Sequence, residues 1–285
     1  MNTENENWGA QQRTGMGGAR TRVISITSGK GGVGKTTVVS NVALQLAKEG
    51  KRVLILDGDL GMANVDIMFN VRTKQGIHDV LKGEATLQDV IMEVSKNVFL
   101  IPGGNGIYGL QRLSVFEKQA LLHEVSSLGH EYDVMLVDTA PGIDENVLWL
   151  NSAAQEICVI VTPDPASIAD SYALIKVLHQ RCRENRFSIL CNQVKDEADG
   201  KRLFTKLDAI AQRFLYVSLD YKGSIPSDPI LRQCTRAQEL VTRSNPDSLS
   251  SRAIKSLARE FAGFEPSHEG KGGLQFFWEQ LVGVA

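Results

Sequence analysis

A glycine-rich stretch from Gly29 to Thr37 is the part of the chain best suited to chemistry. Its sequence, GKGGVGKTT, fits the phosphate-loop pattern G-x-x-x-x-G-K-[ST] and adds a second lysine, Lys30. Glycines let successive backbone N–H groups turn toward one anion, and the helix that follows adds its positive N-terminal end. Lys35 can neutralise β- and γ-phosphate oxygens, and the Thr36 hydroxyl is a hard ligand for Mg²⁺. The stretch therefore predicts nucleotide binding, against the alternative of a glycine-rich turn without a ligand. The predicted phosphate-binding residues are Gly29, Gly31, Gly32, Val33, Gly34, Lys35, Thr36 and Thr37.

Carboxylates follow two further apolar runs that read as strands. Asp57 and Asp59 come after the first of these runs, and Asp138 ends the second, four residues before Gly142. Ligands of open parallel sheets sit at the carboxyl ends of strands, so we expect these groups to meet beside the phosphate loop. Asp59 is then placed to orient an attacking water, Asp57 to support Mg²⁺ or the loop, and Asp138 to hold Mg²⁺ through a water. The Gly142 amide could sense the γ-phosphate. The alternative for each aspartate is a helix N-cap or a turn residue.

The choice of base depends on the segment after a late strand. GTPases usually carry N-K-x-D there, whereas this chain has Asn192-Gln193-Val194-Lys195. The absence of the lysine and the aspartate lowers the case for guanine. It leaves Asn192 as a candidate contact for an adenine edge.

Apolar runs alternate with amphipathic segments from residue 22 onward, which predicts a mostly parallel sheet covered by helices on both faces, a three-layer α/β/α fold. The expected strands are Val23–Thr27, Val53–Asp57, Val98–Ile101, Val134–Asp138, Ile157–Thr162 and Ile189–Asn192, with a weaker one near Phe214–Ser218. The expected helices are Thr37–Lys48, Val115–Leu128, Ala166–Arg183 and Gly200–Arg213. We expect a polar, flexible tail at 1–20, one domain over 21–262, a glycine-rich linker at 263–273 and a final helix at 274–283.

The composition is that of an ordinary globular protein. The 285 residues are 42% hydrophobic and 22% charged. The net charge of −2 gives the protein no overall electrostatic attraction to nucleic acid. None of the four cysteines is in C-x-x-C spacing, so we expect packed, reduced thiols and no metal site on them. We expect no signal peptide, because residues 1–20 are polar, and no apolar run reaches the ~18 residues of a membrane span.

These motifs together resemble the MinD/ParA class of deviant Walker ATPases, which are SIMIBI-type P-loop NTPases. The likeness spans about residues 22–262 and rests on the loop with Lys30, on Asn192, and on the segments Leu56–Asp66 (LDGDLGMANVD), Val137–Gly142 (VDTAPG) and Ile225–Asp228 (IPSD). Within that class, Ser167–Lys176 (SIADSYALIK) and Gly272–Leu281 (GGLQFFWEQL) are similar to the flagellar-number regulators called FlhG or FleN.

The resemblance implies a role for single residues. It implies that Lys30 reaches across an ATP-sandwich homodimer to the partner's phosphates, and that Asp59 polarises the water in a slow, dimer-activated ATP hydrolysis. It further implies that Pro226 and Asp228 line an adenine pocket together with Asn192. Two features depart from the family pattern. Gln11-Gln12-Arg13 do not make up the N-terminal motif that activates a partner GTPase, and Pro141 could stiffen the switch loop.

The resemblance also implies a cellular setting. The protein would be cytoplasmic and peripheral to the inner membrane, and it would control flagellar number or placement. The implied partners are a flagellar transcription activator, a pole-marking GTPase and flagellar switch proteins. Two other interpretations stay open: an ATPase for DNA segregation or division-site positioning, and an anti-activator that holds nucleotide without turnover.

The C-terminal segment predicts one short amphipathic helix. Its apolar stripe, at positions i, i+3, i+4, i+7 and i+8, consists of Leu274, Phe277, Trp278, Leu281 and Val282. Such a helix behind a glycine-rich linker favours a membrane-surface anchor. Burying five such side chains gives roughly 8–12 kcal/mol. Ordering about ten residues costs about 10–15 kcal/mol. A single copy should therefore bind weakly, and two copies on a dimer would gain avidity. The alternative is a helix docked on its own domain, or one that alternates between the two positions.

A mild basic excess lies in residues 232–260. Arg232, Arg236, Arg243, Arg252, Lys255 and Arg259 stand there against Glu239, Asp247 and Glu260. We interpret this region as a solvated helical face in preference to a DNA-binding surface.

Overall fold

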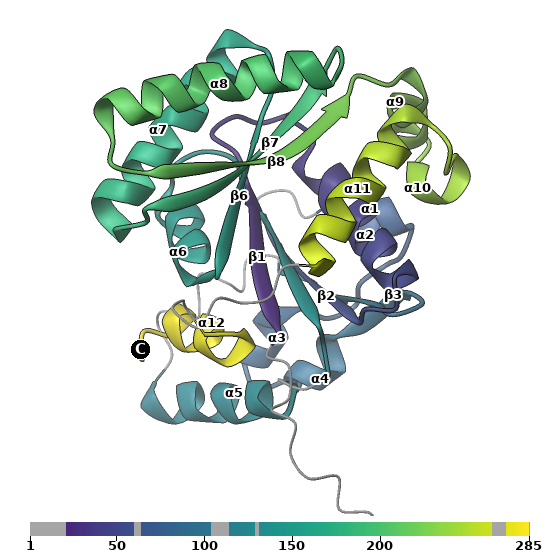
Figure 1. The fold of residues 1–285 in the computed structure, drawn as a ribbon. Helices are drawn as coiled ribbons and strands as arrows, with labels where there is room; N and C mark the ends of the chain where they lie inside the picture. Colours follow the sequence, from purple (N-terminus) through teal and green to yellow (C-terminus); the bar gives the residue numbers. More distant parts are fainter. Residues whose placement is uncertain (1–20, 60–63, 104–113, 129–130, 264–271, 285) are drawn as a thin grey trace, which may run out of the picture.

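An eight-stranded sheet forms the centre of the molecule in a computed structural model, which describes residues 21–59, 64–103, 114–128, 131–263 and 272–284 (Figure 1). The strand order is β3-β4-β2-β5-β1-β6-β7-β8, and every neighbouring pair is parallel except β3 and β4. The strands are β1 (Arg22–Thr27), β2 (Val53–Gly58), β3 (Met92–Ser95), β4 (Val98–Ile101), β5 (Val134–Thr139), β6 (Glu156–Val161), β7 (Arg186–Val194) and β8 (Ser218–Pro226). The predicted tail lies outside the described residues.

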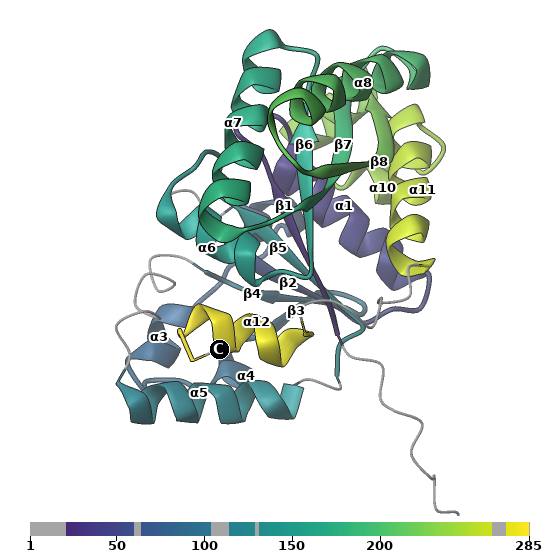
Figure 2. The ribbon, with the colours of Figure 1, turned by 60° about the vertical axis from the view of Figure 1, so that its left-hand side comes forward.

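Helices cover both faces of this sheet (Figure 2). They are α1 (Lys35–Lys48), α2 (Val65–Phe69), α3 (Ile77–Leu81), α4 (Leu87–Val90), α5 (Val115–Leu128), α6 (Glu145–Ala153), α7 (Pro165–Cys182), α8 (Glu197–Phe214), α9 (Pro229–Arg236), α10 (Val241–Ser244), α11 (Leu249–Gly263) and α12 (Leu274–Leu281). Helices α1, α2 and α9 to α11 pack on one face, and α3 to α8 with α12 pack on the other. This arrangement confirms the predicted three-layer α/β/α fold.

Successive residues of the strands point into opposite cores, as the pleat requires. In β5, Val134 and Leu136 belong to the core beneath α1 and α11, whereas Met135 and Val137 belong to the core beneath α5, α6 and α12. All six residues of β5 are buried. Strands buried on both faces are continuous apolar runs, which is why the sequence alone identified them.

The predicted strands and helices are confirmed with ends shifted by a few residues, with one exception. The weak strand near Phe214–Ser218 is wrong, because Phe214 closes helix α8 and β8 begins only at Ser218. Helix α8 carries its buried residues at Leu203, Leu207 and Ala211, so helical periodicity continues into a run that looks β-like on composition. Short elements such as β3, α3 and α4 were not predicted, since four or five residues carry little periodic signal.

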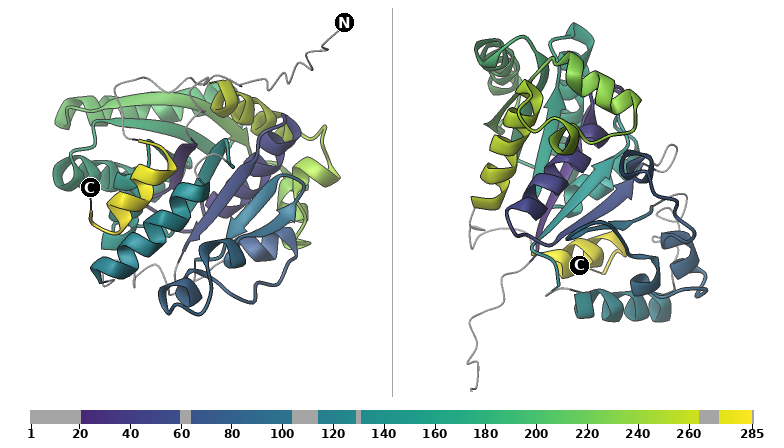
Figure 3. Two further views of the ribbon diagram at one scale, coloured as in Figure 1. Left: turned by 90° about the horizontal axis from the view of Figure 1, so that it is seen from below. Right: turned by 90° about the vertical axis from the view of Figure 1, so that its right-hand side faces the viewer.

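The final helix packs as part of the domain in this structure. The whole predicted stripe is buried: Leu274, Phe277, Trp278, Leu281 and Val282 are each 2% exposed or less. Helix α12 lies alongside α5 and contacts α6 (Figure 3). Trp149 of α6 donates to the carbonyl of Gln280 at 3.3 Å. The docked position is the second of the alternatives drawn from the sequence, and the part of the predicted linker at 264–271 lies outside the described residues.

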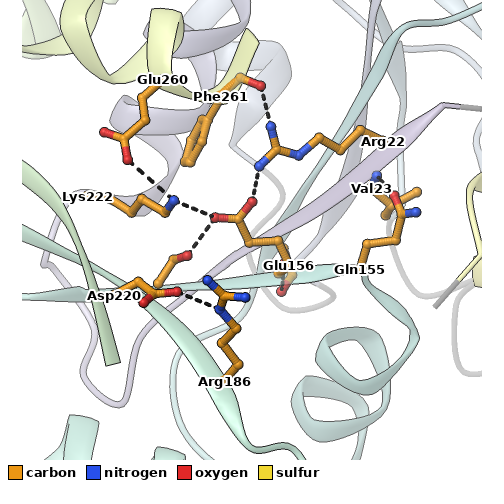
Figure 4. A network of polar contacts seen from close by, with 11 residues as sticks. Arg22, Val23, Gln155, Glu156, Arg186, Asp220, Lys222, Glu260 and Phe261 are labelled. Carbon is orange, nitrogen blue, oxygen red and sulfur yellow. Dashed lines mark hydrogen bonds and ion pairs between the residues drawn. The ribbon is translucent and has the colours of Figure 1, made fainter. Parts of the chain in front are cut away.

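A largely buried polar network ties the first strand to the last helix of the main domain (Figure 4). Arg22 donates to the carboxylate of Glu156 and to the carbonyl of Phe261, near the end of α11. The ammonium group of Lys222 lies 3.7 Å from Glu156 and 3.3 Å from Glu260. Separating one partner from a buried ion pair would leave an uncompensated charge, which is costly. A shift of α11 would separate these partners, so the network holds α11 in one position against β1, β6 and β8.

Candidate nucleotide-binding site

The phosphate loop connects the end of β1 to the start of α1, in the middle of the sheet. Gly32 and Gly34 have φ angles of 76° and 93°, a region that favours glycine. Gly34 is the N-cap of α1 and offers no side-chain acceptor, and no acidic residue lies in the first turn of the helix. The first N–H groups of α1 have no partner within the helix, so they are available to an anion, as the sequence predicted.

Two loop glycines are required because other segments approach the loop closely. A Cβ on Gly29 would overlap the backbone carbonyl of Asp170 in α7. A Cβ on Gly34 would lie 2.8 Å from Nδ2 of Asn192. The amide of Asn192 donates at 2.7 Å to the carbonyl of Val33, so strand β7 holds the loop from the side. These contacts give the loop its shape before any ligand binds.

Lys35 points back over the loop toward the carboxylates. Its Nζ lies 3.2 Å from the hydroxyl of Ser28, and the Gly142 amide donates at 2.9 Å to the carbonyl of Ser28. Burial lowers the pKa of Lys35, and the charges of Asp138 and Asp59 act in the opposite direction. The structure thus brings Lys35, Asp59 and Gly142 to one place at the carboxyl ends of β1, β2 and β5.

Asp57 and Asp138 are direct neighbours on β2 and β5. Burial is the main cause that raises the pKa of Asp57 to about 6 and that of Asp138 to about 7. Oδ1 of Asp138 is a buried oxygen without a hydrogen-bond partner, and the polar side chain of Thr36 opposes the rise in the pKa of the same carboxylate. An unsatisfied carboxylate oxygen beside a threonine hydroxyl is a donor set that Mg²⁺ and its waters prefer. The residues present therefore fit the predicted metal ion, which Thr36 and Asp138 would hold.

Asp57 shapes the segment that carries Asp59. Its carboxylate accepts from the backbone N–H groups of Asp59, Asn64 and Val65 at 3.1 to 3.2 Å. These bonds fix the backbone at Asp59 and at the start of α2 on one carboxylate, and Asp59 itself is half-buried. Asp57 thus acts on the loop, which was one of its two predicted roles. The family-like residues 60–63 lie outside the described residues.

Lys30 points away from its own loop toward the start of α7. It forms an ion pair with Asp164, whose carboxylate also caps α7 through the N–H of Ala166. The two side chains are 38% and 44% exposed, and this contact lowers the pKa of Asp164. Asp164 was not predicted. The available signal is its place directly before Pro165, the first residue of a helix, which is typical of an N-cap.

A pocket of about 310 Å³ adjoins the loop on the side of β7 and α9. Its lining includes Gly34, Thr37, Asn192, Pro226 and Asp228, all of which were predicted for nucleotide binding. Arg232, Thr235 and Arg236 of α9 also line it and were not assigned to the site from the sequence. Their i, i+3 and i+4 spacing on one helix face was the signal that could have identified them.

Two of the residues predicted to contact the nucleobase also have structural roles. Asp228 accepts from the N–H of Ile230 at 2.8 Å and from the hydroxyl of Ser250 at 2.7 Å, so it caps α9 and holds the start of α11. Oδ1 of Asn192 accepts from the N–H of Gln193 at 2.9 Å. An amide side chain has two donors and two lone pairs, so Asn192 can still reach a base edge. Their contacts with a base stay predictions.

The two raised aspartate pKa values predict how the nucleotide-free protein responds to pH. The folded state binds more protons than the unfolded state between about pH 4 and pH 7, so the free energy of unfolding falls as pH rises through this window. Asp138→Asn removes the buried charge and should be about 1–3 kcal/mol more stable than the native chain at pH 8, with a clearly smaller difference at pH 5. Urea unfolding at both pH values measures this. Asp247→Asn, at an exposed position, is the control, and a less stable Asp138→Asn at pH 8 would contradict the assignment.

Two other possible sites have no support in the described part of the chain. No group of three or more histidine, cysteine or acidic side chains there could hold a metal ion by itself. No helix within those residues is long and apolar enough to cross a bilayer. The four cysteines are free, and three of them are buried.

Comparison with known proteins agrees with this geometry. Residues 21–189 match a family described as AAA domain. The chain is 39% identical to "Antiactivator FleN" of Pseudomonas aeruginosa, over 92% of this chain and 93% of that protein. It is 33% identical to "Flagellum site-determining protein YlxH" of Helicobacter pylori, over 84% and 81%. The septum site-determining protein MinD of Pyrococcus horikoshii, solved in complex with Mg-ADP, superposes with a TM-score of 0.64 at 30% identity, covering 85% of this chain and 98% of that one. The chain therefore belongs to the MinD/ParA family of P-loop ATPases, in the group of FleN and YlxH.

Proposed function

We propose that the protein is an ATP-driven switch that regulates flagellar number or placement. The observation that carries this proposal is a complete phosphate loop, with its second lysine, in a chain 39% identical to an antiactivator called FleN. The name of the second relative, a flagellum site-determining protein, points to the same process. A flagellar transcription activator, a polar GTPase and flagellar switch proteins are the partners that the family resemblance suggests.

The residues of the site have distinct tasks in this proposal. The amides of the loop and Lys35 bind the triphosphate, and Arg232 and Arg236 stand beside the pocket that would take the nucleoside. Mg²⁺, when bound near Thr36 and Asp138, would supply positive charge to the phosphate oxygens. Asp59 orients the attacking water, and its position depends on Asp57. The Gly142 amide, now bonded to the loop at Ser28, would change partner when a γ-phosphate is present.

In this conformation the Lys30 side chain is paired with Asp164 and does not point toward the phosphate site of its own chain. An ion pair between exposed side chains contributes only about 0–1 kcal/mol, so its release from Asp164 costs little. A lysine freed in this way could extend to the phosphates of a second copy, as an arginine finger does in other NTPases. This supports a homodimer that forms around ATP.

We further propose that α12 moves from its groove to the inner membrane when the dimer forms. The same five side chains are buried in the groove and would be buried in a bilayer, so the exchange is close to balanced. A small difference in free energy, such as that from the avidity of two α12 helices on one dimer, can then decide whether α12 lies in the groove or in the bilayer.

The experiment that tests the switch is sedimentation of the full-length chain with ADP and with a non-hydrolysable ATP analogue, both with Mg²⁺. We expect a monomer with ADP and a dimer with the analogue. A dimer in neither state would remove the trans role of Lys30, and calorimetry without nucleotide uptake would remove the whole proposal. Steady-state phosphate release separates this switch from a protein that only holds nucleotide.

Removal of α12 should abolish ATP-dependent binding to vesicles. A chain ending at Gly270 lacks the whole apolar stripe, so we expect its pelleting with phosphatidylglycerol-containing vesicles to fall to the level without lipid. The control measures thermal unfolding and ATP binding of the shortened chain. Both are needed because removal of α12 exposes the apolar side chains of α5 and α6 that it covers. If the full-length and shortened chains pellet equally, α12 is not the anchor.

A further inference from the structure

Helix α6 contacts both the nucleotide site and the final helix. It begins at Glu145, just after Gly142, and packs against β1, β5 and α12 (Figure 1). Trp149, Leu150 and Asn151 are consecutive on this helix. Successive helix residues point about 100° apart, so these three side chains can reach three different neighbours from a single turn.

Leu150 packs beneath the acidic end of β2. Its side chain is fully buried, and a Cβ on Gly58 would lie 2.8 Å from Cδ1 of Leu150. Gly58 stands between Asp57 and Asp59, so the tip of this leucine lies against the backbone that joins the two carboxylates. Packed interiors leave few voids, so a displacement of α6 and a displacement of this backbone should occur together.

Asn151 joins α6 to the strands that lead into the phosphate loop and the Gly142 segment. It is fully buried, accepts from the Ser25 hydroxyl at 2.7 Å and donates to the Thr27 hydroxyl at 3.2 Å. Thr139, which follows Asp138 on β5, donates to the same Thr27 hydroxyl at 2.9 Å. Buried polar groups are costly to leave without a partner, so these bonds hold α6 to the ends of β1 and β5.

Trp149 joins α6 to α12. Its indole N–H donates to the carbonyl of Gln280 at 3.3 Å, and its ring packs against the core that contains Leu150 and the whole α12 stripe. The surface on which α12 docks therefore includes α6. A shift of α6 would change both the bond to Gln280 and the packing of the stripe.

We propose that α6 couples the nucleotide state of the site to the docking of α12. This inference rests on the proposed release of α12 and names the element that transmits it. The Gly142 amide now bonds to Ser28, and α6 has the position on which α12 docks. When a γ-phosphate takes the Gly142 amide instead, α6 moves and the docking of α12 weakens. Coupling between two sites is reciprocal, so docked α12 weakens binding of ATP by the same factor.

Hydrogen exchange of the full-length chain, without lipid, measures the docking of α12 at the amides of Phe277–Leu281. We expect exchange there to be about fivefold faster with Mg²⁺ and the ATP analogue than with Mg²⁺ and ADP, the lower end of usual coupling factors. Leu150→Val removes the contact with Gly58 and should bring this ratio close to one. The control Leu207→Val makes the same change at a fully buried position of α8, in another core, and should keep the ratio.

The reciprocal effect is measured by calorimetry of nucleotide binding. Leu281→Ser places a hydroxyl in the buried stripe and should undock α12 in the full-length chain. We expect this variant to bind the analogue about fivefold more tightly than the native chain does, and to bind ADP equally well. Thermal unfolding checks that the main domain stays folded. Trp149→Phe, which loses the bond to Gln280, should change the affinity in the same direction by a smaller factor.

The outcomes separate the role of α6 from the proposed switch. Equal exchange of α12 with ADP and with the analogue, in a chain that binds both, would overturn the coupling; sedimentation decides the ATP-driven dimer independently. An undiminished ratio in Leu150→Val would show that release reaches α12 by another route. That result would overturn the role of α6 and leave the release itself in place. A chain that takes up neither nucleotide would remove the proposed function and this inference with it.

Discussion

Replacement of Lys30 by alanine should abolish ATP-dependent dimerisation and lower turnover by about 10³-fold, the lower end of the effect of an arginine finger. The side chain is half-exposed and bonded only to Asp164 among the described contacts, so its loss should not disturb the fold. The phosphate loop and Lys35 remain, so the variant should still bind ATP. Analytical ultracentrifugation with the analogue and steady-state phosphate release measure the two effects.

The control for Lys30 is Lys206→Ala, which removes an exposed lysine from α8. That variant should dimerise and hydrolyse ATP as the native chain does. A normal dimer formed by Lys30→Ala would show that the second lysine does not act across the interface. Asp164→Asn provides a further comparison, because it frees Lys30 and should leave dimerisation intact or strengthen it.

Replacement of Asp59 by alanine should leave ATP binding and dimerisation intact and lower phosphate release by about 10²–10⁴-fold. This is the range for loss of a group that positions or deprotonates a reacting water. The backbone N–H of Asp59 bonds to Asp57 and is retained in the variant, so the backbone at residue 59 should keep its position. The variant should therefore accumulate as an ATP-bound dimer on vesicles.

Undiminished phosphate release by Asp59→Ala would remove this residue from its role. Asp247→Ala, at an exposed position before α11, is the matched control for loss of one carboxylate. Asp57→Ala should differ from Asp59→Ala and from Asp247→Ala in both turnover and stability. Its carboxylate accepts three backbone bonds, so its loss should displace Asp59 and also lower stability.

Much of the site could be predicted because its parts are local in the sequence. The phosphate loop needs glycines, a lysine and a threonine at consecutive positions, so one segment reveals it. Asp138 ends a buried apolar run, and ligands of open α/β sheets bind beyond the carboxyl ends of the strands. The structure agrees: Asp57 and Asp138 are paired neighbours at the carboxyl ends of β2 and β5.

The contacts that were missed join segments far apart in the sequence. Lys30 meets Asp164, which stands 134 residues later, and Arg22 meets Phe261, 239 residues later. Such pairs depend on the order of strands in the sheet and on the packing of helices, and no period in the sequence records them. The wrong strand near Phe214 has a local cause. The aromatic and β-branched residues after Arg213 favour a strand by composition, but Phe214 is the last residue of α8, whose buried positions earlier in the chain define the helix.

The sequence by itself determined the chemistry of this protein: a triphosphate loop, an acidic group at each of two strand ends, and a helix with one apolar face. Residue type and spacing are sufficient for these, since each is built from a single continuous segment. Only the tertiary structure decided where Lys30 and the final helix lie. It bonds Lys30 to α7 and packs the stripe of α12 against α5 and α6, because exposed charge and apolar surface both associate with the nearest complementary surface in the folded chain.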